Sequence, residues 1–103
     1  MLKHIVLFRR KVDVAPQPEF EPSLVARMKA LETQIPGIRA WKLSANEIDR
    51  PICWGYVLES RFDDEAGLNA YLTHPIHQAL IADLKTYFEW ATADYTESNA
   101  ETA

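Results

Sequence analysis

The chain has 103 residues, of which 48% are hydrophobic and 25% charged, a balance that fits one globular domain around a single core. The formal net charge of −4 gives no general electrostatic attraction to nucleic acid or to an anionic membrane surface, and the lone Cys53 excludes an intramolecular disulfide and a cysteine-ligated metal cluster. The N-terminus lacks the apolar length of a signal peptide, and no apolar run reaches the roughly 18 residues of a membrane-spanning helix, so we expect a cytoplasmic protein without nucleic-acid or membrane partners.

The first part of the chain predicts a strand, a loop, a helix and a second strand. Residues 2–10 are rich in Ile, Val, Leu and Phe on both alternating faces, which is typical of a strand buried on both sides. Three prolines within residues 12–22 indicate an extended loop, after which Pro22-Ser23 opens a helix. The apolar residues of this helix recur with the period of one helix face until Pro36 ends it. Residues 38–45 alternate as a strand.

The middle of the chain predicts a further strand and a short helix. After a polar turn, residues 52–62 read as a central strand, in which Gly55 indicates a bulge or a close approach of backbones. Carboxylates at residues 63–65 favour a helix start, because the helix macrodipole stabilises negative charge there. We expect this helix to run to Tyr71 or Leu72.

The last part of the chain predicts one more helix and a closing strand. Proline is favoured at the first helical position, so Pro75 marks a helix start with His74 as its N-cap. The apolar stripe of this helix extends to Phe88. Residues 90–96 alternate again and predict the final strand, and the polar residues 98–103 are expected to form a disordered tail.

This order of elements predicts an α+β fold class, with a domain over residues 1–97. Strand, helix, strand, strand, helix in two pieces and strand make a ferredoxin-like βαββαβ protomer, an antiparallel sheet with helices on one face. The first and third strands are apolar on both faces, so the uncovered face of the sheet needs apolar cover. A second copy of the chain supplies it most simply, and we expect a homodimer through the open sheet face.

Residues 71–77 concentrate the chemistry that the sequence offers. His77 lies in the first turn of a helix, where the macrodipole disfavours protonation, and it shares the core-facing stripe with Leu80 and Ile81. His77 is therefore a candidate general base, and Tyr71, at the end of the preceding helix, a candidate donor to a substrate carbonyl oxygen. The alternatives are a buried histidine bonded to backbone and a core tyrosine bonded to a loop carbonyl.

Further candidates come from the strands. His4 shares a strand face with core residues and can meet His77 between sheet and helix, although a half-buried structural histidine is the alternative. The chain is aromatic enough to line an apolar cavity, although core and dimer packing is the simpler account. The candidate substrate-binding residues are Phe8, Trp54, Tyr56, Leu80 and Ile81.

A metal site is a weaker hypothesis. His74 and His77 are three residues apart and, together with His4, form a candidate set of metal ligands. No neighbouring acidic residue clearly completes the coordination shell. We therefore predict no metal and no cofactor. The thiol of Cys53 has no basic neighbour in sequence nearer than Arg50, so we expect it to be unreactive.

Five segments together resemble the stress-responsive A/B barrel (Dabb) family, and the resemblance covers nearly the whole chain. They are Lys3-His4-Ile5-Val6-Leu7-Phe8, Ile35-Pro36-Gly37-Ile38, Glu59-Ser60-Arg61-Phe62-Asp63, Tyr71-Leu72-Thr73-His74-Pro75-Ile76-His77 and Asp94-Tyr95. The resemblance implies a ferredoxin-like protomer whose sheet packs against a partner sheet to form a barrel between two subunits. The family includes uncharacterised bacterial proteins, a plant stress protein that forms very stable oligomers and a plant polyketide cyclase.

The family pattern also bears on the site. The cyclase has a cofactor-free pocket whose tyrosine and two histidines match Tyr71, His77 and His4. A further pocket histidine of the cyclase falls at Tyr56, so this sequence departs from the cyclase there. The resemblance therefore implies acid–base chemistry on a carbonyl compound with a different pocket wall. The alternative is a non-catalytic module that binds a small hydrophobic molecule or serves as a stable oligomer.

Overall fold

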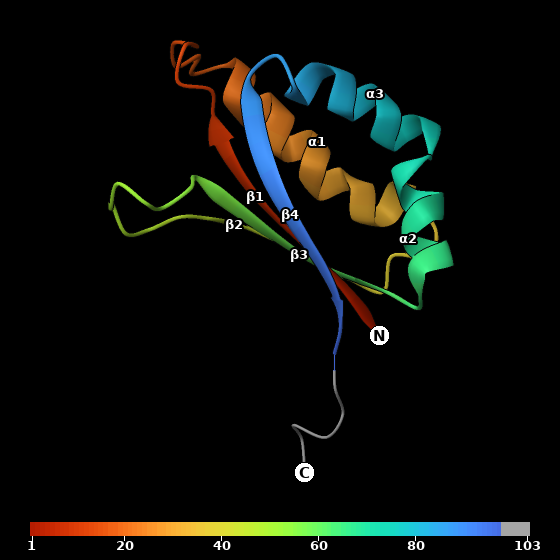
Figure 1. Ribbon diagram of the computed structural model, residues 1–103. Helices are drawn as coiled ribbons and strands as arrows, with labels where there is room; N and C mark the ends of the chain where they lie inside the picture. Colours follow the sequence, from red (N-terminus) through yellow and green to blue (C-terminus); the bar gives the residue numbers. More distant parts are fainter. Residues whose placement is uncertain (98–103) are drawn as a thin grey trace.

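The structure is a computed structural model and describes residues 1–97. Four strands and three helices follow one another as β1, α1, β2, β3, α2, α3 and β4 (Figure 1). The strands are β1 (Leu2–Arg10), β2 (Ala40–Ala45), β3 (Tyr56–Phe62) and β4 (Phe88–Thr96), and the helices are α1 (Phe20–Gln34), α2 (Glu65–Leu72) and α3 (Pro75–Leu84). The tail predicted over residues 98–103 lies outside the described residues.

The four strands form one antiparallel sheet in the order β2-β3-β1-β4. All three helices cover the same face of this sheet, and the other face is open (Figure 1). The predicted α+β fold class and the ferredoxin-like βαββαβ topology are therefore confirmed. Among the described residues, no helix has the length and apolar character needed to cross a bilayer.

The register of the sheet sorts the helix-facing side chains into rows that run across all four strands. Directly paired residues share a face, because side chains alternate between faces along each strand. One row, here called the polar row, consists of Trp41, Ser60, His4 and Asp94. The next row consists of Leu43, Leu58, Val6 and Thr92. The polar row therefore lies beside a mainly apolar row, which forms the floor of the core beneath the helices.

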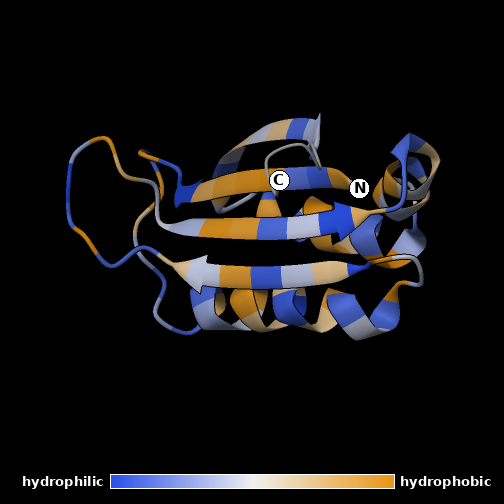
Figure 2. Cartoon of the chain, turned by 90° about the horizontal axis from the view of Figure 1, so that it is seen from below, coloured by the Kyte–Doolittle hydropathy of each residue, from blue (hydrophilic) through white to orange (hydrophobic). Residues whose placement is uncertain are grey.

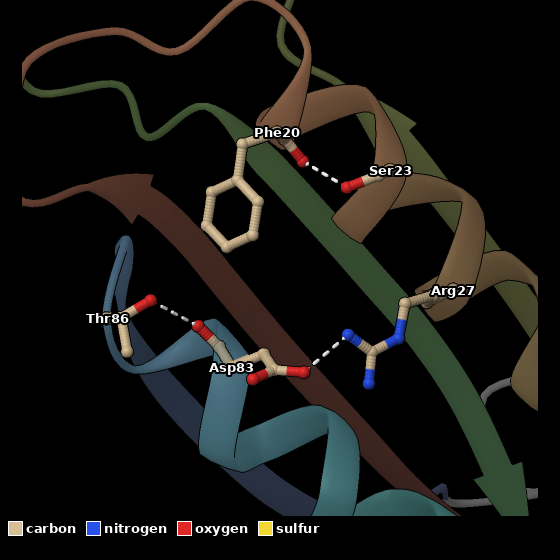
Figure 3. Close-up of polar contacts among 5 residues, drawn as sticks. All are labelled: Phe20, Ser23, Arg27, Asp83 and Thr86. Atoms are coloured by element: carbon tan, nitrogen blue, oxygen red, sulfur yellow. Dashed lines mark hydrogen bonds and ion pairs between the residues drawn. The ribbon is translucent and has the colours of Figure 1, made fainter.

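Helices α1 and α3 close the core over this floor. Leu24, Met28 and Leu31 are the buried residues of α1, and they recur at the spacing that the sequence predicts for one helix face. On the solvent side, Arg27 of α1 forms an ion pair with Asp83 of α3 at 2.6 Å, which links the two helices (Figure 3). This pair is exposed, so we assign the alignment of the helices mainly to the apolar contacts below it.

Three elements begin at other residues than the sequence predicts. Strand β2 begins at Ala40 and not at residue 38, and the starts of α1 and β3 differ as well. Helix α1 begins at Phe20 and therefore includes Pro22, which the first turn tolerates because its N–H groups have no intrahelical acceptor. Strand β3 begins at Tyr56, and the four residues before it belong to the loop. Within that loop, the N–H of Gly55 donates to the Phe8 carbonyl at 2.8 Å, a close approach of two backbones.

The end of α3 also differs from the prediction. The helix ends at Leu84, and Phe88, which the sequence places on the helical stripe, is the first residue of β4. Its ring packs edge-on against Tyr87 and Tyr56. The apolar spacing continued across a tight turn, so periodicity alone gave no sign of the helix end.

The open face of the sheet is apolar where β1 and β3 pair near the β2–β3 loop (Figure 2). Leu7 pairs with Val57 there, and its side chain alternates away from the buried Val6 and Phe8. Ala91 and Ala93 of β4 pair with Leu7 and Ile5. We call Ile5, Leu7, Val57, Ala91 and Ala93 the open-face patch.

Candidate functional site

The junction between α2 and α3 sets the geometry of the site. Pro75 is the first residue of α3, and the Ile76 N–H donates to His74 Nδ1 at 3.1 Å. The predicted role of His74 as N-cap is therefore confirmed. This bond holds the His74 ring against the first turn of α3. Within residues 1–97, no group of three or more His, Cys, Asp or Glu residues is arranged to hold a metal ion.

His77 is held by the backbone of the preceding helix and remains free at one ring nitrogen. It is 8% exposed, and its Nδ1 lies 2.9 Å from the Leu72 carbonyl oxygen. A carbonyl only accepts, so Nδ1 carries the hydrogen and Nε2 keeps a lone pair. Burial lowers the pKa of His77, the nearby His4 and His74 lower it further, and the Leu72 bond opposes them. The sequence predicted this direction from the macrodipole, whereas the main cause is burial.

Tyr71 lies at the centre of the site and contacts its other aromatic side chains. It is 3% exposed, and its ring centroid lies 4.4 Å from that of His77, 5.8 Å from Trp41 and 6.1 Å from His4. Burial raises the pKa of Tyr71, and no hydrogen bond joins its hydroxyl to another described residue. The hydroxyl therefore stays protonated near neutral pH and is available as a donor.

His4 is oriented by a carboxylate that sequence reasoning missed. It is 5% exposed, and its Nδ1 is hydrogen-bonded to a carboxylate oxygen of Asp94, its cross-strand neighbour on β4. Because a carboxylate accepts, Nδ1–H donates, and Nε2 makes no hydrogen bond to a described residue. In the sequence, Asp94 stands out only as part of the Asp94-Tyr95 segment of the family pattern. Asp94 and His4 are 90 positions apart in the sequence and meet only because β1 and β4 pair in this register. Hydrophobic periodicity does not reveal the pairing register of two strands.

These residues share one cavity of about 80 Å³ between the sheet and the helices. His4, Tyr71 and His77 line it together with three of the predicted substrate-binding residues, Phe8, Leu80 and Ile81. Met28 and Leu31 of α1 and Trp90 and Thr92 of β4 also contribute. The cavity therefore combines mostly apolar walls with a few polar atoms, as small-molecule sites do.

Two of the predicted substrate-binding residues do not line this cavity. The Tyr56 hydroxyl donates to Glu21 at 2.6 Å, and burial together with Glu21 raises the pKa of Tyr56 to about 12. Trp54 lies in the loop before β3, where the Arg9 guanidinium stacks 4.1 Å from the centre of its ring. Strand alternation does not extend to Trp54 because β3 begins after it, and Tyr56 is held by the start of α1.

The fold and the cavity define a class: a ferredoxin-like α+β domain with a mainly apolar cavity of about 80 Å³ under its helices and an open sheet face. The family model described as "Stress responsive A/B Barrel Domain" matches residues 2–97. The chain therefore belongs to the stress-responsive A/B barrel (Dabb) family, which confirms the resemblance found in the sequence.

Proteins similar to this chain include uncharacterised relatives and enzymes. An uncharacterised protein of Streptomyces coelicolor is 36% identical over 95 residues, which are 92% of this chain and 98% of the relative. The crystal structure of a dimeric protein of unknown function with a ferredoxin-like fold, from Bacteroides fragilis, has a TM-score of 0.76 at 31% identity and covers 93% of this chain and 95% of its own. Hydroxynitrile lyase from Passiflora edulis has a TM-score of 0.80 at 17% identity over 95% of this chain and 94% of the lyase, a likeness of fold.

Proposed function

We propose that the cavity binds a small, mainly apolar carbonyl compound, and that His77, Tyr71 and His4 carry out cofactor-independent acid–base chemistry on it, of a cyclase or lyase kind. The observation that carries the proposal is the pairing of Tyr71 and His77 on one cavity, with ring centroids 4.4 Å apart. One residue offers a free basic nitrogen and the other an unpaired hydroxyl. A base beside a donor is the arrangement that proton abstraction next to a carbonyl requires.

The roles follow from the free atoms. His77 Nε2 takes the proton from the carbon next to the carbonyl, and the electron pair of that C–H bond moves towards the carbonyl oxygen. The Tyr71 hydroxyl donates a hydrogen bond to this oxygen and stabilises the negative charge that develops there. In this proposal His4 Nε2 holds or returns a proton on the sheet side, and the bond from Nδ1 to Asp94 orients the ring.

Proton abstraction is testable without the natural substrate. Phenylacetone in D₂O exchanges its benzylic protons when a base removes them, and ¹H NMR follows the loss of signal. This probe is larger than the cavity of about 80 Å³, so its entry requires the lining side chains to move apart. We expect the wild-type protein to accelerate this exchange and His77→Gln to lower the rate about 10²- to 10⁴-fold, the usual contribution of a general base. His74→Asn is the matched control, because asparagine also caps helices and His74 lies off the cavity. Exchange that is equally fast in His77→Gln would remove His77 from the proposal.

A non-catalytic binding module is the second candidate. The mostly aliphatic and aromatic lining of the cavity supports it, because such walls retain hydrophobic molecules without any chemistry. This candidate predicts that phenylacetone binds, as seen in shifts of the Tyr71 and His77 resonances, while its benzylic protons exchange no faster than in buffer. Accelerated exchange would exclude it.

We also propose that the chain forms a homodimer through the open-face patch. The Bacteroides fragilis relative is dimeric, and Leu7 at the centre of the patch is 38% exposed although it is surrounded by apolar neighbours. Light scattering after size exclusion should give twice the chain mass for the wild type and the single mass for Leu7→Glu. Ile48→Glu, in the exposed β2–β3 loop, should stay dimeric. A Leu7→Glu variant that remains a dimer would place the interface elsewhere.

A further inference from the structure

The indole N–H of Trp41 is buried and lacks a hydrogen-bond acceptor within the described part of the chain. Such a group loses its water partner on folding and gains none from the protein, which costs stability. Burial of an unpaired donor in a native structure therefore calls for an explanation. The position of Trp41 supplies one.

Trp41 belongs to the polar row beneath Tyr71, and the rest of that row is internally paired. The Ser60 hydroxyl donates to the His4 carbonyl at 2.9 Å, and His4 Nδ1 bonds to Asp94. Trp41 lines the same cavity as these histidine and tyrosine side chains, with its ring centroid 5.8 Å from that of Tyr71. The row thus leaves one donor unused, and it belongs to a residue on the cavity wall.

We propose that Trp41 is a ligand-binding residue whose indole N–H donates a hydrogen bond to the carbonyl oxygen of the molecule bound in the cavity. This inference rests on the proposed function and specifies what the β2 side of the cavity recognises. An indole N–H is an uncharged donor and never accepts, so the ligand must present an acceptor at this wall. A carbonyl oxygen has two lone pairs and can accept from Trp41 and Tyr71 together. The cavity therefore selects a carbonyl compound over a hydrocarbon of the same shape.

The competing explanation is that the N–H points at the face of the Tyr71 ring. The two rings are inclined at 67°, an edge-to-face geometry in which an N–H can contact a π system. The two explanations differ in what a bound carbonyl does. If Trp41 is a ligand-binding residue, its indole N–H forms a hydrogen bond to the oxygen of the bound carbonyl compound. If the N–H contacts the Tyr71 ring, the ligand oxygen does not change that contact.

Two probes of matched shape separate them: phenylacetone and 2-methyl-3-phenylpropene, in which a CH₂ group replaces the carbonyl oxygen. The indole proton of Trp41 is followed by ¹H–¹⁵N NMR of the wild-type protein and assigned by its contacts to Tyr71, so the result needs no variant. We expect phenylacetone to move this proton downfield and the hydrocarbon to leave it in place. Trp41→Phe should bind phenylacetone about 3- to 10-fold more weakly, the worth of one neutral hydrogen bond, and the hydrocarbon equally well.

Trp54→Phe is the matched control, because Trp54 lies outside the cavity, and it should bind both probes as the wild type does. The inference is overturned while the proposed function stands if phenylacetone shifts the Tyr71 and His77 resonances and leaves the Trp41 indole proton unmoved. If neither probe shifts the Tyr71 or His77 resonances, the proposed ligand site fails and this inference fails with it.

Discussion

Replacing Tyr71 by phenylalanine should separate function from stability. The ring contacts to His77, Phe62, Trp41 and His4 remain in the variant, and only a hydroxyl that bonds to no described residue is removed. A buried polar group without a partner costs about 1–3 kcal/mol, and the cavity side of this hydroxyl reduces that cost. Tyr71→Phe should therefore leave the free energy of unfolding unchanged or raise it by up to about 1 kcal/mol. The rate of benzylic exchange should fall about 10²-fold, as when an oxyanion donor is lost.

Tyr87→Phe is the matched comparison, because it is the same substitution at a buried tyrosine whose hydroxyl is fully engaged. That hydroxyl donates to Glu21 at 2.6 Å and accepts from the Gln17 N–H at 3.2 Å. Its removal should cost about 1.5–3 kcal/mol, the usual worth of a hydrogen bond to a charged group. Urea unfolding followed by circular dichroism measures both variants. The reasoning is refuted if Tyr71→Phe loses as much stability as Tyr87→Phe, because the Tyr71 hydroxyl would then be bonded within the fold.

Three further predictions concern His77 and Asp94. Burial lowers the pKa of His77 below its usual 6.5, so exchange should stay constant near neutral pH and fall only as the pH drops through this lowered value, with an acid limb centred below 6.5. In the unfolded chain His77 takes up its proton at a higher pH than in the folded chain. The free energy of unfolding of the wild type should therefore decrease relative to that of His77→Gln as the pH falls below 6.5. If the free energies of unfolding of the two proteins change in parallel with pH, the burial of His77 is contradicted. Asp94→Asn should slow exchange while preserving the cavity, because an amide no longer fixes the His4 tautomer; an unchanged rate would exclude His4 from the reaction.

The local part of the site could be predicted from sequence. His74, Pro75 and His77 are neighbours in the chain, and the cap chemistry of proline and histidine at a helix start fixes where they lie. Tyr71 precedes His77 by six residues across the same junction, so a helix end and a helix start suffice to bring their rings together. The fold class followed from the order of elements, and periodicity gave that order.

What could not be predicted depends on register and on strand ends. Asp94 meets His4, and Trp41 joins the same row, because of how β1 pairs with β4 and β2 with β3. A shift of one residue would turn each side chain to the other face. Trp54 was placed in the pocket by extending alternation beyond the start of β3. Gly55 fits a bulge within a longer strand as well as a loop end, so the sequence alone does not show that the strand begins at Tyr56.

The most direct measurement compares the rates of benzylic exchange of phenylacetone in the wild type, Tyr71→Phe, His77→Gln and the double variant. Base and donor act on the same ligand in one step, so the double variant should lose little more than the slower single variant, as residues that function as a unit do. Losses that multiply, or a double variant as fast as the wild type, would contradict joint acid–base chemistry by Tyr71 and His77 in this cavity.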